Sequence, residues 1–306
     1  FADFYNVHGG CVVTTAIDKY VYTIVKERFD KQIYVNYSIK EIVDSVDDLK
    51  HELVREAMKK TGVKDGIEIT FLSDVPSSGS GLGSSSTVTV GVLNALYQYT
   101  GRAVGAEQLA REACEIEISI LKKPIGVQDQ YIAAFGGVKF LNFSKKGIDV
   151  EDLKLSKEVL DDLKSYMMVF FTGRTRQANN VLQEQKDNIK QKTDNLKQLA
   201  QLARDSKKVL LKGDIEGLGK MLHQGWLLKK QLASKISDSE IDEIYKAALD
   251  AGAIGGKISG AGGGGFMTLF VPSQKRDNVR QALKNLREMP VGLSKDGSKV
   301  IFNIDR

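Results

Sequence analysis

The feature that most constrains this chain is a glycine- and serine-rich stretch at residues 74–97, which reads DVPSSGSGLGSSSTVTVGVLNALY. Gly79, Gly81 and Gly83 alternate within it, and an apolar pattern with helical spacing follows over residues 88–96. Glycine has no Cβ, so backbone amides at these positions can come close to an anion and adopt positive φ angles. The first turn of the following helix adds unpaired N–H groups and the positive end of the helix dipole. The stretch therefore predicts a phosphate-binding loop that leads into a helix.

Two common phosphate-binding motifs do not describe this loop. A P-loop ends in Lys followed by Ser or Thr, whereas Gly83 is followed by three serines, and a dinucleotide fingerprint has the spacing GxGxxG instead of GxGxG. A Ser/Gly-rich surface linker is the structural alternative, but a strand-like run over residues 67–72 and a long amphipathic helix bound the loop. The hydroxyls of Ser84, Ser85 and Ser86 lie where they can cap the helix or bind a metal ion.

The composition predicts a soluble globular protein. The 306 residues suit one large or two medium domains with a buried core, and 42% hydrophobic and 27% charged residues are typical of that class. The net charge of +5 is spread along the chain, without a basic block or a basic stripe interleaved with aromatic residues. We therefore expect an anionic small-molecule substrate and no nucleic-acid partner.

The cysteine count and the hydropathy pattern predict a cytoplasmic location. Cys11 and Cys114 are too few for a disulfide framework and lack metal-ligand spacing, which fits a reducing compartment. No apolar run reaches the roughly 18 residues that would span a bilayer, and no signal peptide is visible. We therefore expect no membrane partner.

Hydrophobic periodicity predicts strands and helices in both halves of the chain. In the first half we expect one long or two short strands over residues 12–25, a strand over 33–38 joined to it as an antiparallel hairpin, a helix over 47–61 stopped by Gly62, a strand over 67–72, a helix from the glycine loop to Gly101, a helix over 107–121, a strand over 138–143, and a polar connection with one short helix up to residue 164.

In the second half of the chain, helical patterns are longer than in the first. We expect a buried strand over residues 166–172, a helix with a seven-residue repeat from 182 to Gly213, a helix over 214–235 that carries Trp226, a helix that ends near Gly252, a strand over 266–271, a helix over 274–287 and a strand over 299–304. The repeat is compatible with a coiled coil, but it is only about four heptads long, which favours a packed helical hairpin. Ser237 and Glu240 predict a capping box at the helix that ends near Gly252.

A second glycine-rich run, GGKISGAGGGGFMTLFV, lies near the C-terminus. Gly260, Gly262 and Gly265 satisfy the spacing GxGxxG, yet a strand follows where a dinucleotide site requires a helix. The run therefore predicts a tight glycine turn that leads into a strand.

Glu117 is a carboxylate that we expect to point inward. Counting by threes and fours, Glu117 shares a helical stripe with Cys114, next to an apolar stripe made of Leu109, Ala113, Ile116 and Ile120. Glu112 and Glu115 fall towards the polar side by the same count. Because a buried carboxylate needs a cation or several donors, Glu117 is either half of an internal ion pair or a metal ligand. We favour the metal ligand.

Asp129 lies between two glutamines in the nearly uncharged segment GVQDQYIAAFGG. This setting is unusual for a solvated surface carboxylate and suits a catalytic carboxylate held by amide neighbours. Asp is common in loops and helix caps, so Asp129 alone is a weak signal. The phosphate-binding loop and Glu117 strengthen it.

Three segments together carry a family resemblance. PSSGSGLGSSS followed by a helix, GVQDQY, and KISGAGGGGF resemble the second motif, the catalytic segment and the third motif of the galactokinase, homoserine kinase, mevalonate kinase and phosphomevalonate kinase superfamily, and the similarity covers nearly the whole chain. The resemblance implies an α+β sugar kinase fold of two domains. These would be an N-terminal ribosomal-protein-S5-like α/β domain over residues 1–164, with ATP-binding and catalytic roles, and a C-terminal ferredoxin-like α+β domain over 165–306 that completes the substrate site.

Within that superfamily, TAIDKYVY, REACEIEI with KPIGVQDQY, and FFTGRTRQA look most like the bacterial heptose kinases, although fucokinase domains share much of this texture. The resemblance implies ATP and Mg²⁺ as cofactors and phosphorylation of D-glycero-D-manno-heptose 7-phosphate at its anomeric hydroxyl, giving the 1,7-bisphosphate for nucleotide-activated heptose and surface glycans. A sugar-phosphate partner and a monomer or homodimer are expected. The alternatives are a fucose, mannose or galactose kinase, a mevalonate-type decarboxylase, and a non-catalytic sensor. The presence of Asp129, Ser85 and Glu117 favours the enzyme.

The resemblance also implies roles for individual residues. Asp129 matches the catalytic aspartate, and Ser85 and Glu117 match the two magnesium ligands. The residues matching the loop around the ATP phosphates are Pro76, Ser77, Ser78, Gly79, Ser80, Gly81, Leu82, Gly83, Ser84 and Ser85. Those matching the third motif, which packs beside that loop, include Gly260, Ala261, Gly262 and Gly263.

A substrate that carries a phosphate needs a cationic pocket, and Arg or Lys supply it. The residues that we expect to shape this pocket are Asp18, Lys19, Gly173, Arg174 and Arg176, although Arg and Lys at strand ends are often solvated surface residues. Family members begin with a basic strand and a GGGTD-like turn, and FADFYNVHGG resembles the segment just after that turn. An expected substrate aspartate and a basic residue are therefore assigned to no residue of this sequence.

Overall fold

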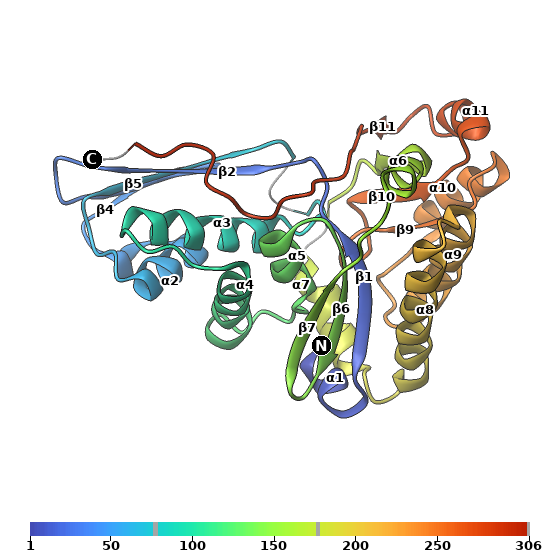
Figure 1. The fold of residues 1–306 in the computed structure, drawn as a ribbon, viewed down its shortest axis with the longest axis horizontal. Helices are drawn as coiled ribbons and strands as arrows, with labels where there is room; N and C mark the ends of the chain where they lie inside the picture. Colours follow the sequence, from blue (N-terminus) through green and yellow to red (C-terminus); the bar gives the residue numbers. More distant parts are fainter. Residues whose placement is uncertain (76–78, 176–177, 305–306) are drawn as a thin grey trace. The chain divides into compact units, whose positions relative to one another are not determined.

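The computed structural model of the chain describes residues 1–75, 79–175 and 178–304 (Figure 1). Contacts between Cα atoms divide it into two compact units. Unit 1 is made of Phe1–Asp18, Ser78–Leu82 and Gly137–Ser294, and unit 2 of Lys19–Ser77, Gly83–Gly136 and Lys295–Arg306. The sequence predicts a domain boundary between residues 164 and 165. Both of these residues belong to unit 1, and the boundary stays a prediction. Both units combine helices with antiparallel or mixed sheets, which confirms the α+β class.

Unit 2 contains a four-stranded sheet in the order β2 (Val21–Glu27), β5 (Ile67–Ser73), β3 (Ile33–Asn36) and β4 (Lys40–Val43). Two helices, α2 (Glu52–Thr61) and α3 (Ser84–Tyr99), lie on the same face of this sheet (Figure 1). Side chains alternate between the two faces of a strand, and Ile67 and Ile69 of β5 are fully buried. The sheet therefore packs against α3 and supports it, mainly through β2.

The antiparallel hairpin predicted between residues 12–25 and 33–38 is wrong. The first segment forms two separate strands, and its second strand, β2, pairs with β5 instead of β3. β3 pairs with β5 in parallel, and with β4, which the sequence did not predict, in an antiparallel sense. A parallel pair needs a long crossover connection, and the segment that contains α2 provides it.

Two further helices of unit 2 carry the acidic residues singled out above. α4 (Ala106–Cys114) continues directly into a π-helical segment, η2 (Glu115–Ile120), and α5 is Gln128–Phe135. A π turn holds more residues than an α turn, so the stripe counted from the sequence drifts, and Ile120 is exposed instead of buried. Glu112 was expected on the polar side, which is wrong. It is buried and accepts a hydrogen bond of 2.6 Å from Tyr97 Oη, because α3 packs against that side of α4.

Unit 1 contains two sheets. The first has the order β1 (Gly10–Thr15), β6 (Val138–Ser144) and β7 (Gly147–Asp152), with Gly10 paired to Phe143. The second has the order β11 (Arg287–Glu288), β8 (Met167–Phe171), β10 (Phe266–Phe270) and β9 (Gly255–Ile258). All pairs in both sheets are antiparallel. β7 lies in the polar run where only a connection was expected, because a strand with one exposed face needs few apolar residues.

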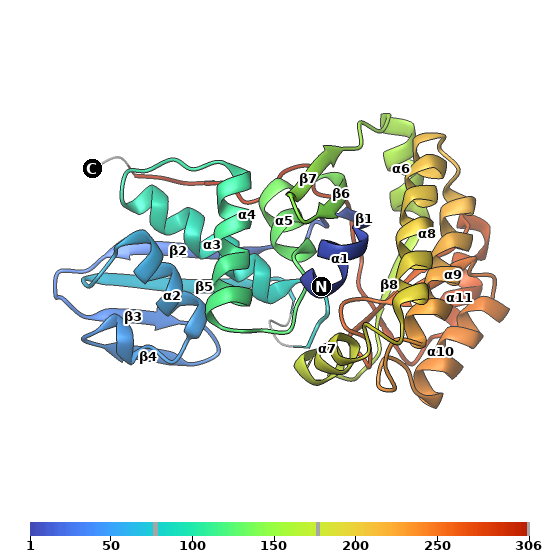
Figure 2. The same cartoon turned by 90° about the horizontal axis from the view of Figure 1, so that it is seen from below.

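The helices of unit 1 are α1 (Ala2–His8), α6 (Lys157–Tyr166), α7 (Ala178–Asp187), α8 (Thr193–Leu211), α9 (Ile215–Lys230), α10 (Ser239–Asp250) and α11 (Arg276–Ala282). α8 and α9 run side by side, which confirms the packed hairpin (Figure 2). The single long helix predicted from residue 182 is wrong, since a turn over residues 188–192 separates α7 from α8. At this turn, Asn188 donates a side-chain hydrogen bond of 3.0 Å to the Leu232 carbonyl.

Two other local predictions are wrong. Asp238, and not a capping box of Ser237 and Glu240, caps α10 by accepting a hydrogen bond from Ile241 N. Residues 299–304 form no strand within the part of the chain that the structure describes, and Ile301 and Phe302 there are more than 70% exposed. Alternation of apolar residues favours a strand, but a strand also needs a neighbour to pair with.

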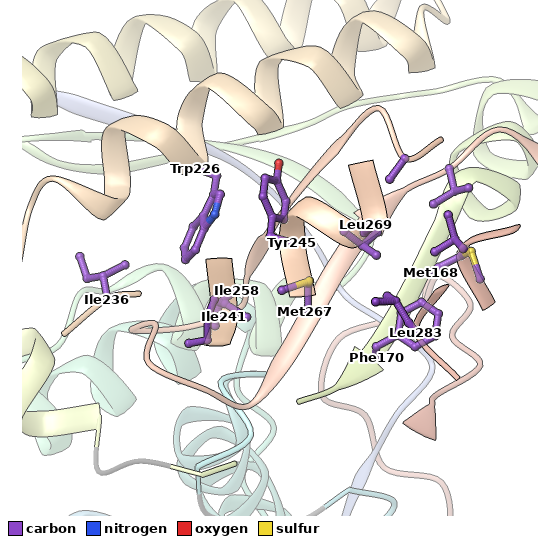
Figure 3. Packing of buried hydrophobic residues seen from close by; sticks show 14 of the residues in the cluster. Met168, Phe170, Trp226, Ile236, Ile241, Tyr245, Ile258, Met267, Leu269 and Leu283 are labelled. Carbon is purple, nitrogen blue, oxygen red and sulfur yellow. The ribbon is translucent and has the colours of Figure 1, made fainter. Parts of the chain in front are cut away.

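A buried cluster holds β8 and β10 against the helices of unit 1 (Figure 3). Trp226 of α9 is 1% exposed, and its ring centroid lies 6.2 Å from that of Tyr245 of α10. Met168 and Met267 contribute from the two strands. The cluster fixes the strand ends from which the glycine turn before Phe266 and the segment after Phe171 depart. Among the helices in the described ranges, none combines the length and apolar character that crossing a bilayer would require.

Candidate active site

Asp129 lies against the last glycine of the phosphate-binding loop. Gly83 is the N-cap of α3 with a φ of 75°, and a Cβ built on it would lie 3.4 Å from Asp129 Cβ and 3.7 Å from its Oδ2. Glycine therefore provides both the backbone conformation and the room for the carboxylate. Asp129 itself is in the first turn of α5 and is partly buried. The structure thus brings the predicted catalytic residue to the start of α3, within unit 2.

The start of α3 has the character of an anion site. The first N–H groups of an α-helix have no intrahelical acceptor, and a glycine N-cap offers them no side chain. The helix dipole adds positive potential at the same end. Leu82, just before this end, donates its N–H to Ser80 Oγ over 3.3 Å, and that bond lies within unit 1. The predicted loop residues Pro76, Ser77 and Ser78 lie outside the described residues.

Ser85 and Glu117 are joined directly. Ser85 Oγ donates a hydrogen bond of 2.9 Å to Glu117 Oε2, and Gln130 Nε2 donates one of 3.0 Å to Glu117 Oε1. Glu117 is fully buried, which confirms its predicted inward orientation, whereas Ser85 is exposed. Across the described ranges no cation forms an ion pair with Glu117, so its neighbours are neutral donors and the internal ion pair is not observed. Glu117 belongs to the π-helical segment η2, and such segments occur frequently at functional sites.

The thiol of Cys114 lies near these carboxylates. Burial, together with the charges of Glu117, Glu107 and Asp129, raises the pKa of Cys114 far above its usual range. A thiol of this kind stays protonated and unreactive at neutral pH. The thiol lies 4.0 Å from the Val127 carbonyl oxygen. The carboxylates of Asp129 and Glu117 are the stronger candidates for chemistry.

In unit 1, the two glycine segments pack backbone against backbone. A Cβ on Gly81 would lie 2.5 Å from the Ser259 carbonyl oxygen, and a Cβ on Gly260 would lie 2.6 Å from Gly81 Cα. Phe266 N donates to Ser80 O over 3.3 Å. The predicted packing of the third motif beside the phosphate-binding loop is therefore observed for residues 79–82.

The rest of the second glycine turn is fixed by α7, α9 and the segment before α10. Ala261 O accepts a hydrogen bond of 3.2 Å from Gln185 Nε2, and Gly263 N donates to Ile236 O over 2.8 Å. Gly262, with a φ of 100°, has no room for a side chain because of Ile236. Hydrogen bonds from Gln185 and to Ile236 thus hold the turn in place. The turn leads into β10, as the sequence predicts.

Lys229 is a residue of this site that the sequence argument missed. Its Nζ donates a hydrogen bond of 2.5 Å to the Gly260 carbonyl, which places a cation at the glycine turn. Lys229 follows the buried Trp226 by three residues, so both lie on one face of α9. That spacing is the signal that could have drawn attention to it.

The residues predicted to bind the sugar phosphate have varied surroundings. Arg174 is paired with Asp238 and Glu240, with Nη–O distances of 2.7 Å to each. Asp18 Oδ1 accepts a hydrogen bond of 2.7 Å from Gly292 N, which gives it a structural partner. Gly173 is exposed and Lys19, in unit 2, is partly buried, while Arg176 lies outside the described residues. Of the described members of this set, Asp18, Gly173 and Arg174 belong to unit 1 and Lys19 belongs to unit 2. The roles of all five residues stay predictions.

Two family models match the chain in order. GHMP kinases N terminal domain matches residues 49–137, and GHMP kinases C terminal matches residues 206–288. The first match contains the phosphate-binding loop, Glu117 and Asp129. The second contains the glycine turn and Lys229.

Known proteins resemble the chain over nearly its whole length. It is 32% identical over 293 residues to the D-glycero-alpha-D-manno-heptose 7-phosphate kinase of Campylobacter jejuni, covering 90% of this chain and 85% of that protein. The crystal structure of a D-glycero-D-manno-heptose 1-phosphate kinase from Bacteroides thetaiotaomicron superposes with a TM-score of 0.78 at 28% identity, covering 96% of this chain and 90% of that one. A putative sugar kinase from Campylobacter jejuni superposes with a TM-score of 0.74 at 30% identity, covering 94% and 88%.

These similarities agree with the site geometry. The superfamily resemblance read from PSSGSGLGSSS, GVQDQY and KISGAGGGGF is confirmed, as is the two-domain kinase fold that it implied. The chain belongs to the GHMP kinase family and is an ATP-dependent sugar kinase.

Proposed function

We propose that this kinase transfers the γ-phosphoryl group of ATP to the anomeric hydroxyl of D-glycero-D-manno-heptose 7-phosphate, giving the 1,7-bisphosphate. The observation that carries the proposal is the position of Asp129 against Gly83, at the start of α3. Ser85 lies in the first turn of α3 and is hydrogen-bonded to Glu117 of η2. The heptose assignment is supported by the names of two relatives, a 7-phosphate kinase and a 1-phosphate kinase. Both names describe kinases of heptose phosphates.

Phosphoryl transfer depends on positioning and on neutralising negative charge more than on covalent chemistry. Backbone N–H groups of the glycine loop and of the first turn of α3 would hold the ATP phosphates. The carboxylate of Asp129 would accept the proton of the attacking hydroxyl, a contribution on the order of 10²- to 10⁴-fold in rate. The amide of Gln130, next in sequence to Asp129, donates its hydrogen bond to Glu117.

Mg²⁺ would be held by Ser85 and Glu117. The fit rests on their oxygens, since Ser85 Oγ and Glu117 Oε2 are 2.9 Å apart. Two neighbouring ligands on an octahedral Mg²⁺ at 2.0–2.1 Å are also about 2.9 Å apart. The ion, when bound, neutralises charge on the ATP phosphates. A fully buried carboxylate without a cationic partner in the described residues also fits a metal ligand.

The phosphate of the sugar would be bound by the cations of unit 1. Arg174 is the first candidate, because it lies three residues after the end of β8 and Arg forks suit phosphate. Its guanidinium is paired with Asp238 and Glu240, so a phosphate would compete with two carboxylates. Lys229, at the Gly260 carbonyl, is the second candidate.

The test is ADP production, measured by a coupled assay across a substrate panel. The panel contains the heptose 7-phosphate, the heptose 1-phosphate, free heptose, fucose, mannose, galactose and mevalonate. We expect kcat/KM for the heptose 7-phosphate to exceed that for every other compound by at least about tenfold, the effect of one charged hydrogen bond. Equal activity on a free sugar would move the assignment to another sugar kinase. Nucleotide binding without turnover on any compound would favour a sensor.

A further inference from the structure

Gln130 is the one glutamine of the QDQ segment that is buried. It follows Asp129 on the first turn of α5, is 0% exposed, and its Nε2 donates the 3.0 Å hydrogen bond to Glu117 Oε1. Its Oε1 is buried as well and has no hydrogen-bond partner in the described residues. Gln128, two residues earlier, is exposed. The two glutamines therefore differ in environment although they flank the same carboxylate.

The orientation of the Gln130 amide is determined by Glu117. A carboxylate only accepts hydrogen bonds, so the NH₂ group must face it, and the opposite orientation would bring two acceptor oxygens together. The amide oxygen is then turned away and left without a donor. A buried acceptor without a partner costs stability, whereas the hydrogen bond from Nε2 stabilises the buried carboxylate of Glu117. The main interaction of the amide is therefore with Glu117.

The contact restricts how Glu117 can rotate. With Oε1 bonded to Gln130, the other oxygen, Oε2, stays beside Ser85 Oγ at 2.9 Å. Without this bond, the carboxylate could turn about its last side-chain bond and exchange its two oxygens. Partners of a metal-binding carboxylate commonly fix it in this way, and losing one typically lowers metal affinity or activity by 10- to 100-fold.

We propose that Gln130 is a positioning residue that holds Glu117 in the orientation in which Oε2 and Ser85 Oγ together receive a divalent cation. The inference rests on the proposed function, in which Ser85 and Glu117 bind Mg²⁺. It adds that the turn of α5 that carries Asp129 also sets the geometry of the cation site. Asp129 and Gln130 would therefore join proton acceptance and metal positioning in two consecutive residues.

The test replaces Gln130 with Met, which keeps the length and the buried, unbranched shape but removes the donor. Gln128→Met is the matched control on the same helix. Mn²⁺ binding to the enzyme–ADP complex is measured by electron paramagnetic resonance, which does not depend on turnover. We expect Gln130→Met to weaken Mn²⁺ binding by about 10- to 100-fold, and Gln128→Met to change it less than twofold. ADP affinity without metal should stay near that of the wild type, and a cooperative thermal transition without metal shows that the variant is folded.

Steady-state kinetics provide a second measurement. The Mg²⁺ requirement would not change if Gln130 only stabilised the fold. In Gln130→Met, the Mg²⁺ concentration for half-maximal activity should rise by about 10- to 100-fold, while the KM for the sugar at saturating Mg²⁺ stays within twofold. If Gln130→Met does not fold, Gln130→Asn takes its place, because its amide is one methylene too short to reach Glu117. The same shifts are expected for it.

The outcomes separate this inference from the proposed function. Normal Mn²⁺ binding in a folded Gln130 variant, with weakened binding in Glu117→Gln, would overturn the role of Gln130 and leave the metal site in place. Unchanged Mn²⁺ binding in both Glu117→Gln and Gln130→Met would overturn the metal site itself, and this inference with it.

Discussion

Ser85 and Glu117, 32 positions apart in the sequence, are joined by a 2.9 Å hydrogen bond between Ser85 Oγ and Glu117 Oε2. The serine is exposed on the first turn of α3, and the glutamate is fully buried on the π-helical segment after α4. The hydroxyl of Ser85 is therefore accessible to a ligand. The carboxylate of Glu117 is fixed by its burial and by the hydrogen bond from Gln130.

Removing either oxygen should raise the requirement for Mg²⁺. Ser85→Ala and Glu117→Gln are each expected to increase the Mg²⁺ concentration for half-maximal activity by about tenfold or more, with little change in sugar binding. Activity titrations with Mg²⁺ at saturating ATP and sugar measure this effect. Thr100→Ala, at the opposite end of α3, serves as the control. If Glu117→Gln kept the wild-type titration, its role as a ligand would be lost.

Asp129→Asn should abolish most turnover while preserving the shape of the site. The carboxylate lies against Gly83, and Asn fills the same space without accepting a full proton. We expect kcat to fall by at least about a hundredfold with ATP affinity nearly unchanged. Asp65→Asn, at an exposed turn before β5, is the control. A kcat within threefold of the wild type would remove Asp129 from the mechanism.

Gly81→Ala should be far more damaging than Gly101→Ala. Both residues have φ angles near 70°, but a Cβ on Gly81 would lie 2.5 Å from Ser259 O, whereas one on Gly101 would have no heavy atom within 4 Å. The left-handed conformation costs an alanine about 1–2 kcal/mol at either position, so the difference between the variants reports the clash. We expect Gly101→Ala to lose about 1 kcal/mol of unfolding free energy and to keep its KM for ATP. Gly81→Ala should lose more and raise that KM at least about tenfold, the factor that 1.4 kcal/mol represents. Equal effects would argue against the packing of the two glycine segments.

His51 should make the stability of unit 2 dependent on pH. Its Nδ1 accepts a hydrogen bond from Val54 N and so caps α2, and burial lowers the pKa of its imidazole below the usual 6.5. The neutral form is therefore the one that the fold prefers. The stabilisation is complete above pH 6.5 and is lost as the pH falls through the lower pKa of the folded state. Urea unfolding at pH 7.5 and 5.5 should show lower stability at 5.5. His51→Asn, which caps without titrating in this range, should flatten the dependence, and an unchanged dependence would exclude His51 as its source.

Arg174→Ala should reduce the preference for a phosphorylated sugar over the free sugar. We expect the wild-type preference to be ten- to hundredfold, on the order of the 1.5–3 kcal/mol of a charged hydrogen bond, and the KM for ATP to change little. Arg280 is a matched control, because it is also paired with two carboxylates, Asp277 and Glu288. If both variants lost stability alike and kept the preference, Arg174 would be a structural residue and the phosphate would bind elsewhere.

The sequence predicted the parts of the site that depend on local chemistry. The glycine loop, the helix after it and the inward orientation of Glu117 follow from residue types and from a 3.6-residue period, and each is found in the structure. The contact between Ser85 and Glu117 was not predictable from those rules, because it depends on how α3 packs against the π-helical segment. Lys229 was missed for the same reason, since its partner is a backbone carbonyl 31 residues away.

The errors in the fold share one physical cause, which is that pairing and burial depend on neighbours distant in sequence. β2 and β3 were expected to pair because they are consecutive, yet β5 pairs with both of them. Glu112 was placed on the polar side by its own helix, but α3 covers that side. Residues 299–304 have the alternation of a strand and no partner strand in the described ranges.

The register of β1 against β6 has a consequence for how this chain folds. Gly10 pairs with Phe143 and Thr15 with Val138. More than a hundred residues must therefore be synthesised after β1 before its partner strand, β6, leaves the ribosome. Contacts of such sequence separation slow folding, because the entropy of a long loop is lost before the pairing compensates for it. During that interval the apolar side chains of β1 are available to wrong partners. Folding yield in cells should therefore be more sensitive to chaperone supply and growth temperature than the stability of the finished protein suggests.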